Sequence, residues 1–83
     1  MPQHFSKTIT YDGITALAVI IPEVRPDGVY YEVNVKGFPR FYMTWTALDR
    51  YDVVPQQGLN LPYNFVLSLS DAIEEKEKKR HYT

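Results

Sequence analysis

The clearest cluster of residues that could do polar chemistry is Asp49-Arg50-Tyr51-Asp52. Two carboxylates beside a guanidinium could exchange protons or hold a cation. The simpler interpretation is a local ion pair or an Asx turn, which neighbouring Asp and Arg side chains form at protein surfaces. Asp49, Arg50 and Asp52 are therefore a candidate loop site, and a ligand-binding role for them requires a concave pocket beside the loop.

Nucleophilic and metal-dependent catalysis have little support in the residue inventory. The chain has no cysteine and no Gly-x-Ser-x-Gly segment, and its two histidines, His4 and His81, lie close to the ends. A serine nucleophile needs an adjacent base, and a metal ion needs several clustered ligands. The glycines are too scattered to form a phosphate loop. We therefore expect a non-enzymatic protein without a metal or another cofactor.

A second candidate site combines aromatic and basic side chains. Tyr30 and Tyr42, with Lys36 and Arg40, would share one face of two neighbouring strands, and such a face can stack and neutralise a single-stranded nucleic acid. Glu32 in the same patch would repel phosphate, and tyrosine is also a good strand former. A structural role is the simpler interpretation, and the nucleic-acid face is the alternative.

Composition limits the kind of molecule that can carry these residues. The 83 residues are 45% hydrophobic and 23% charged, enough apolar material for one core in a chain this short. We predict a single domain over residues 1–83, with residues 80–83 as a frayed tail. The formal net charge of -1 provides no field that would attract nucleic acid over a distance. The apolar run 16–21 is too short to span a membrane, and no signal-type start precedes it, so we expect a cytoplasmic protein.

The elements that position these residues begin with a tight hairpin. Asp12-Gly13 supplies the two positive-φ residues of a type I′ turn between strands predicted over 4–11 and 14–22. If Tyr11 pairs with Ile14, the strands have two distinct faces. One face carries Phe5, Ile9, Tyr11, Ile14, Ala16, Ala18 and Ile20. The other carries Ser6, Thr8, Thr10, Thr15, Leu17, Val19 and Ile21.

Two further strands are predicted over 28–36 and 40–47. A turn at Arg25-Pro26-Asp27-Gly28 introduces the first of them, because proline and glycine suit its special backbone positions. Both strands alternate apolar with polar side chains. A three-residue loop, Gly37-Phe38-Pro39, would place apolar residues opposite one another. The predicted pairs are Val35 with Phe41, Val33 with Met43, and Tyr31 with Trp45.

A long connection and a helix complete the chain. Residues 47–61 are predicted to cross over, anchored by Val53, Val54 and Leu59, although so long a connection can also hide a short element. A helix is predicted over 62–79, where an apolar stripe recurs at helical spacing. The stripe consists of Phe65, Val66, Leu69, Ala72 and Ile73. The alternative is a fifth strand over 64–67 followed by a shorter helix. The predicted fold is α+β, a four-stranded antiparallel meander with one C-terminal helix packed on one face.

The most informative surface is the second face of strand 14–22. Leu17, Val19 and Ile21 form an apolar stripe there, yet one helix can cover only one face of the sheet. Either residues 47–61 fold beneath the stripe or another protein covers it, most simply a second copy in a homodimer.

The leading functional hypothesis is therefore a self-associating protein-interaction module that uses Leu17, Val19 and Ile21. The alternative is an accessory protein that binds single-stranded nucleic acid, aided by the basic segment 76–80. A ligand-binding role of the Asp49–Asp52 loop is the third hypothesis. We expect a homodimer or a protein partner, and no membrane association.

Overall fold

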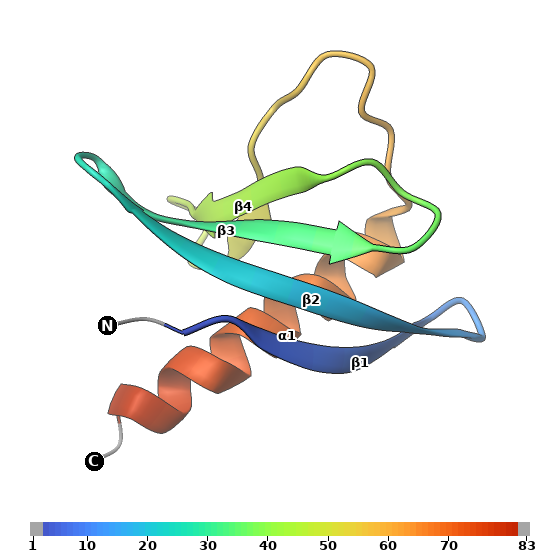
Figure 1. The fold of residues 1–83 in the computed structure, drawn as a ribbon, viewed down its shortest axis with the longest axis horizontal. Helices are drawn as coiled ribbons and strands as arrows, with labels where there is room; N and C mark the ends of the chain where they lie inside the picture. The colour runs from blue at the N-terminus through green and yellow to red at the C-terminus, as the bar shows by residue number, and fades with distance from the viewer. Residues whose placement is uncertain (1–2, 82–83) are drawn as a thin grey trace.

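The computed structural model describes residues 3–81, and the side-chain surroundings of residues 3–77. Its five antiparallel strands lie in chain order and are followed by one helix (Figure 1). The elements are β1 (Phe5–Tyr11), β2 (Ile14–Arg25), β3 (Gly28–Val35), β4 (Phe41–Trp45), β5 (Tyr51–Val53) and α1 (Tyr63–His81). The predicted α+β class and C-terminal helix are confirmed, but the sheet has five strands rather than four. Helix α1 extends into the predicted tail 80–83, whose last two residues lie outside the described part of the chain.

The first hairpin forms as its sequence predicts. Tyr11 pairs with Ile14, and the two turn residues, Asp12 and Gly13, have φ angles of 49° and 77°. A type I′ turn requires positive φ at both central positions, which Gly accepts without strain and Asp accepts at low cost. The two faces of β1 and β2 are therefore divided as expected.

Strand β2 is longer than predicted and forms an extended arm with β3 (Figure 1). It continues to Arg25, which pairs with Gly28 across the predicted Pro26-Asp27 turn. Its pairing with β1 ends where Ile20 meets Phe5. Pro22 lies beyond that point, so β2 pairs there with β3 alone and the missing proline N–H interrupts no second ladder.

The predicted register of β3 and β4 is wrong by two residues. Phe41 pairs with Val33 instead of Val35, and the loop spans residues 36–40 instead of 37–39. The remaining pairs are Tyr30 with Thr44, Tyr31 with Met43, and Glu32 with Tyr42. Because strand side chains alternate with a period of two, this shift leaves the same residues facing the core.

The longer loop allows Phe38 to reach the helix. Its backbone N–H donates to the Val35 carbonyl at 3.1 Å, and its ring stacks on Phe65 with 4.3 Å between centroids. A three-residue turn would give more pairs between β3 and β4, but the five-residue loop packs one more aromatic ring against the core. The shift also leaves Trp45 without the predicted Tyr31 partner, and Trp45 is 50% exposed although the sequence predicted it on the apolar surface.

The predicted crossover 47–61 contains the fifth strand. A tight turn reverses the chain after β4, with the Thr46 N–H donating to the Arg50 carbonyl at 2.9 Å and Asp49 at φ 58°. Strand β5 then pairs Tyr51 with Trp45. Three residues are too few for an alternating pattern to be recognised in the sequence. The alternative strand at 64–67 is wrong, because those residues belong to α1.

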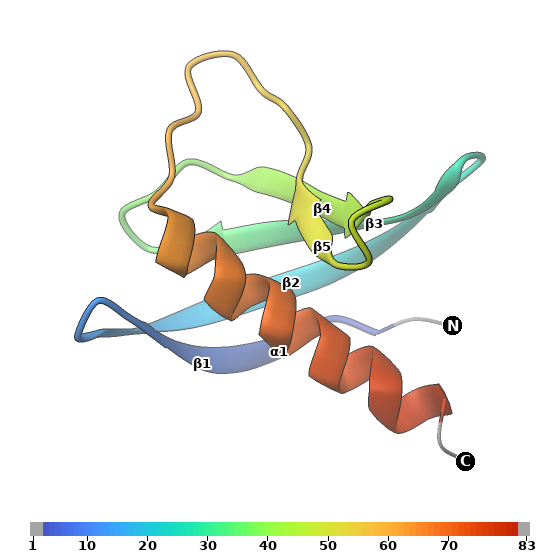
Figure 2. The same cartoon turned by 180° about the vertical axis from the view of Figure 1, so that it is seen from behind.

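Helix α1 packs on one face of the curled sheet and lies alongside both β1 and β5 (Figure 2). The predicted stripe is confirmed: Phe65, Leu69, Ala72 and Ile73 are buried, and Val66 packs against the core at its margin. The Ser68 hydroxyl donates to the Thr10 carbonyl of β1 at 2.7 Å. The helix thus covers the core between the first and last strands.

A buried serine of α1 holds β5 in place. Ser70 is 3% exposed, and its Oγ accepts the Tyr51 N–H at 3.1 Å. We predict that Ser70→Ala lowers the free energy of unfolding in urea by about 1–3 kcal/mol, because it leaves a partly buried N–H without an acceptor. Ser68→Ala is the control, since the Thr10 carbonyl that it frees can bind water. Equal losses in the two variants would contradict this role of Ser70.

Candidate functional site

The outer face of the sheet, opposite α1, carries the apolar stripe predicted on β2. Leu17 is 59% exposed and Ile21 39% exposed, with Val19 partly buried between them. On one side the stripe is paired with Thr8 and Ser6 of β1. On the other side, β3 places Asn34 beside Val19 and Glu32 beside Ile21. The stripe is therefore an open apolar row with polar borders.

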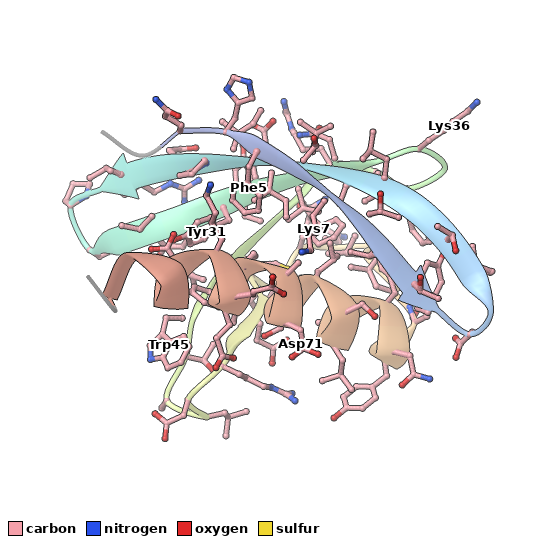
Figure 3. The ribbon with its side chains drawn as sticks, turned by 90° about the horizontal axis from the view of Figure 1, so that it is seen from below. Phe5, Lys7, Tyr31, Lys36, Trp45 and Asp71 are labelled. Carbon is pink, nitrogen blue, oxygen red and sulfur yellow. The ribbon has the colours of Figure 1, made fainter. Side chains whose placement is uncertain are left out.

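The connection 47–61 does not cover this stripe. Its apolar side chains Val53, Leu59 and Leu61 are partly buried against the core instead. Of the two alternatives for covering the outer face, the intramolecular one is therefore wrong in this structure. Figure 3 shows the two sides of the sheet, with Phe5 and Tyr31 between the strands and the helix and Lys36 on the far side.

A smaller apolar group lies on the helix side at the end of the β2–β3 arm. Val24 pairs with Val29, and their exposed fractions are 67% and 38%. Neither residue belongs to a predicted site, and Val24 lies beyond the predicted end of the second strand at position 22. These residues provide a comparison surface on the opposite face of the same strand.

The four residues of the predicted nucleic-acid face do not form one patch. Tyr30 and Tyr42 lie near one another on the outer face. Tyr42 of β4 pairs with Glu32, which is two residues along β3 from Tyr30. Lys36 follows the other end of β3, about 20 Å from Tyr30 along an extended strand. Arg40 precedes β4 and lies at that same distant end.

The cation beside the tyrosine pair is Arg25, which belongs to none of the sites predicted from the sequence. Its guanidinium carbon lies 4.2 Å from the Tyr30 ring centroid and 5.0 Å from that of Tyr42. Its Nε donates to Glu23 at 2.8 Å, and this hydrogen bond raises the pKa of Arg25. The Tyr30 hydroxyl donates to Asp27 at 2.7 Å, which raises the pKa of Tyr30. Alternation along β2 could have indicated Arg25, since it shares a face with Ile21.

The loop site at Asp49, Arg50 and Asp52 is brought beside a concave pocket. Asp49 adopts the positive φ of the turn, whereas Arg50 and Asp52 line a cavity of about 370 Å³. This cavity, called the Arg50 cavity below, lies between β5, the following connection and the start of α1. Its other lining residues are Val53, Leu59, Asn60, Leu61, Tyr63 and Val66.

The predicted local ion pair is present within this loop. Arg50 Nη2 lies 3.5 Å from Asp52 Oδ2, and Asp52 Oδ1 accepts the Val53 N–H at 2.8 Å. Arg50 Nη1 donates to the Tyr63 hydroxyl at 3.4 Å, and this contact raises the pKa of Arg50. Arg50 Nε is buried and has no acceptor among the described residues. The guanidinium is therefore cationic, and its contacts are long.

Among the side chains of residues 3–77, no group of three or more His, Asp or Glu is placed to hold a metal ion. Within residues 3–81, α1 lacks the apolar character that a membrane-spanning helix requires.

Comparisons with known protein families, with curated proteins and with solved structures reveal no significant match in any of the three.

Proposed function

We propose that the chain is a protein-interaction module that forms a homodimer through the outer face of its sheet. The observation that carries this proposal is the exposed stripe of Leu17, Val19 and Ile21. Contiguous apolar rows on a sheet face are costly to leave in water and are typical of interfaces. Packing two such faces would form the aligned sandwich that twisted sheets favour.

The outer face is also complementary to itself. A two-fold axis crossing β2 at Val19 would place Leu17 of one copy over Ile21 of the second. Lys36 comes directly after the residue that pairs with Ala18, so it lies at the Leu17 end, whereas Glu32 pairs with Ile21 at the opposite end. The same axis therefore brings Lys36 of each copy towards Glu32 of the other. A second copy would therefore bury the apolar row and also pair the charges beside it.

Light scattering at micromolar concentration tests the proposal, with a dimer mass as the expected result. We predict that Leu17→Glu weakens association about tenfold or more, because it buries a carboxylate in the apolar row. Val24→Glu is the matched control, an exposed β2 residue on the other face. A strictly monomeric wild-type chain would refute the proposal, and a stronger effect of Val24→Glu would move the interface to the arm.

Charge reversal tests the two-fold arrangement. Lys36→Glu and Glu32→Lys should each weaken the dimer, and the double variant should restore it, because the exchanged charges face one another again. Additive weakening in the double variant would reject this orientation while leaving the stripe itself in place.

The nucleic-acid hypothesis has less support from the geometry. Its tyrosines are already in contact with Arg25, and Lys36 and Arg40 lie at the other end of the strands. Fluorescence titration with single-stranded DNA at two salt concentrations distinguishes the hypotheses, since phosphate contacts make affinity fall steeply with salt.

A further inference from the structure

The Arg50 cavity has the construction of a small-molecule site separate from the outer face. Its volume of about 370 Å³ falls within the range of ligand pockets. Four aliphatic side chains form its walls, namely Val53, Leu59, Leu61 and Val66. Polar groups of Arg50, Asp52, Asn60 and Tyr63 complete the lining. Most of the wall is apolar, and the charged groups come from one short segment.

The donors of Arg50 are incompletely used within the chain. Nε has no acceptor in the described part of the protein, and the contacts of Nη1 with Tyr63 and Nη2 with Asp52 are 3.4 Å and 3.5 Å long. Charge-assisted hydrogen bonds of a well-formed guanidinium pair are much shorter, about 2.7–2.9 Å. The guanidinium can therefore donate to a better-placed oxygen pair than the protein itself provides.

We propose that the Arg50 cavity binds a small monocarboxylate whose apolar body lies against Val53, Leu59, Leu61 and Val66. A carboxylate matches the planar fork of a guanidinium with two parallel hydrogen bonds. The neighbouring Asp52 carboxylate selects against a dianion such as a phosphate ester, because it already neutralises the single positive charge of the site. The aliphatic walls require an apolar body, which inorganic anions lack.

Methyl NMR locates the binding directly, with octanoate as the probe. Titration of the wild-type chain should shift the methyl signals of Val53, Leu59, Leu61 and Val66 in a saturable manner. The methyl signals of Leu17 and Val19 on the outer face should stay in place, which separates this site from the proposed dimer surface. Octanamide, with the same apolar chain and no charge, should bind about tenfold more weakly, since charge-assisted hydrogen bonds are roughly twice as strong as neutral ones.

Two variants test the polar groups in opposite directions. Arg50→Gln should weaken octanoate binding about tenfold or more, because it removes the guanidinium fork. Asp52→Asn should strengthen it several-fold, because it removes the competing charge and keeps the oxygen that accepts the Val53 N–H. Native-like methyl spectra of both variants confirm folding. Absence of methyl shifts at millimolar octanoate, equal binding of octanamide, or unchanged affinity in Asp52→Asn would each overturn the proposal.

Discussion

Replacing Phe65 with alanine is expected to lower the free energy of unfolding by about 3–5 kcal/mol, the usual cost of deleting a fully buried aromatic ring. Phe65 has no exposed surface and joins the helix to two strands and to the loop between β3 and β4. Its ring centroid lies 4.8 Å from that of Tyr11, 4.3 Å from Phe38 and 6.1 Å from Phe41. A cavity at this position would therefore weaken the first hairpin, the loop 36–40 and β4 together.

Urea unfolding followed by circular dichroism measures this loss. Asp71→Ala is the matched control, because Asp71 is an exposed residue of the same helix and points away from the sheet (Figure 3). Alanine has a higher helix propensity than aspartate, so this variant should be as stable as the wild type or slightly more stable. A loss below about 1 kcal/mol for Phe65→Ala would mean that the site collapses without a cavity, contrary to the packing described here.

Alkaline pH should destabilise the fold through two adjacent tyrosines, of which Tyr31 is buried and Tyr51 partly buried. Tyr31 and Tyr51 lie edge to face with 5.3 Å between their ring centroids, and burial raises the pKa of both hydroxyls above the ordinary value. The folded state thus keeps both neutral at a pH where the unfolded chain ionises. Stability is fully present below the unfolded pKa of about 10 and falls as the pH rises beyond it. Each tyrosine should contribute a slope approaching about 1.4 kcal/mol per pH unit.

Denaturant unfolding at several pH values between about 8 and 11.5 measures this dependence around the unfolded pKa. Tyr31→Phe separates the Tyr31 contribution, because phenylalanine keeps the ring and removes the ionisable group. The variant should be less stable at neutral pH, where it loses the polar interactions of the Tyr31 hydroxyl with Tyr51 and Glu77. Its loss of stability above about pH 10 should nevertheless be shallower than that of the wild type. Parallel pH curves for the two proteins would refute the assignment.

Local chemistry made much of the fold predictable. The turn at Asp12-Gly13 fixes its own backbone and so fixes the pairing of Tyr11 with Ile14. The helical spacing of Phe65, Leu69 and Ile73 likewise identifies the buried side of α1. In both cases the interacting residues lie within a few positions of one another, so their spacing in the sequence is enough to predict the interaction.

The β3–β4 register was not predictable in the same way. Apolar pairing favours the three-residue loop when the strands are considered alone, but Phe38 reaches Phe65, which lies 27 positions further along the chain. Strand β5 depends similarly on a distant contact, the hydrogen bond between Tyr51 and Ser70. Neither contact leaves a periodic pattern, because each involves one residue of a short segment.

The candidate sites also combine features set by local spacing with features set by long-range packing. Alternation along β2 determined that Leu17, Val19 and Ile21 share one face, since the pleat of a strand requires it. Only the tertiary structure decided that this face stays open, because residues 47–61 pack their apolar side chains elsewhere. It also placed Arg25 over the tyrosines and Arg50 at the wall of a cavity. Those arrangements depend on how three separate segments meet in space, which follows from the packing of the whole chain rather than from spacing within any one segment.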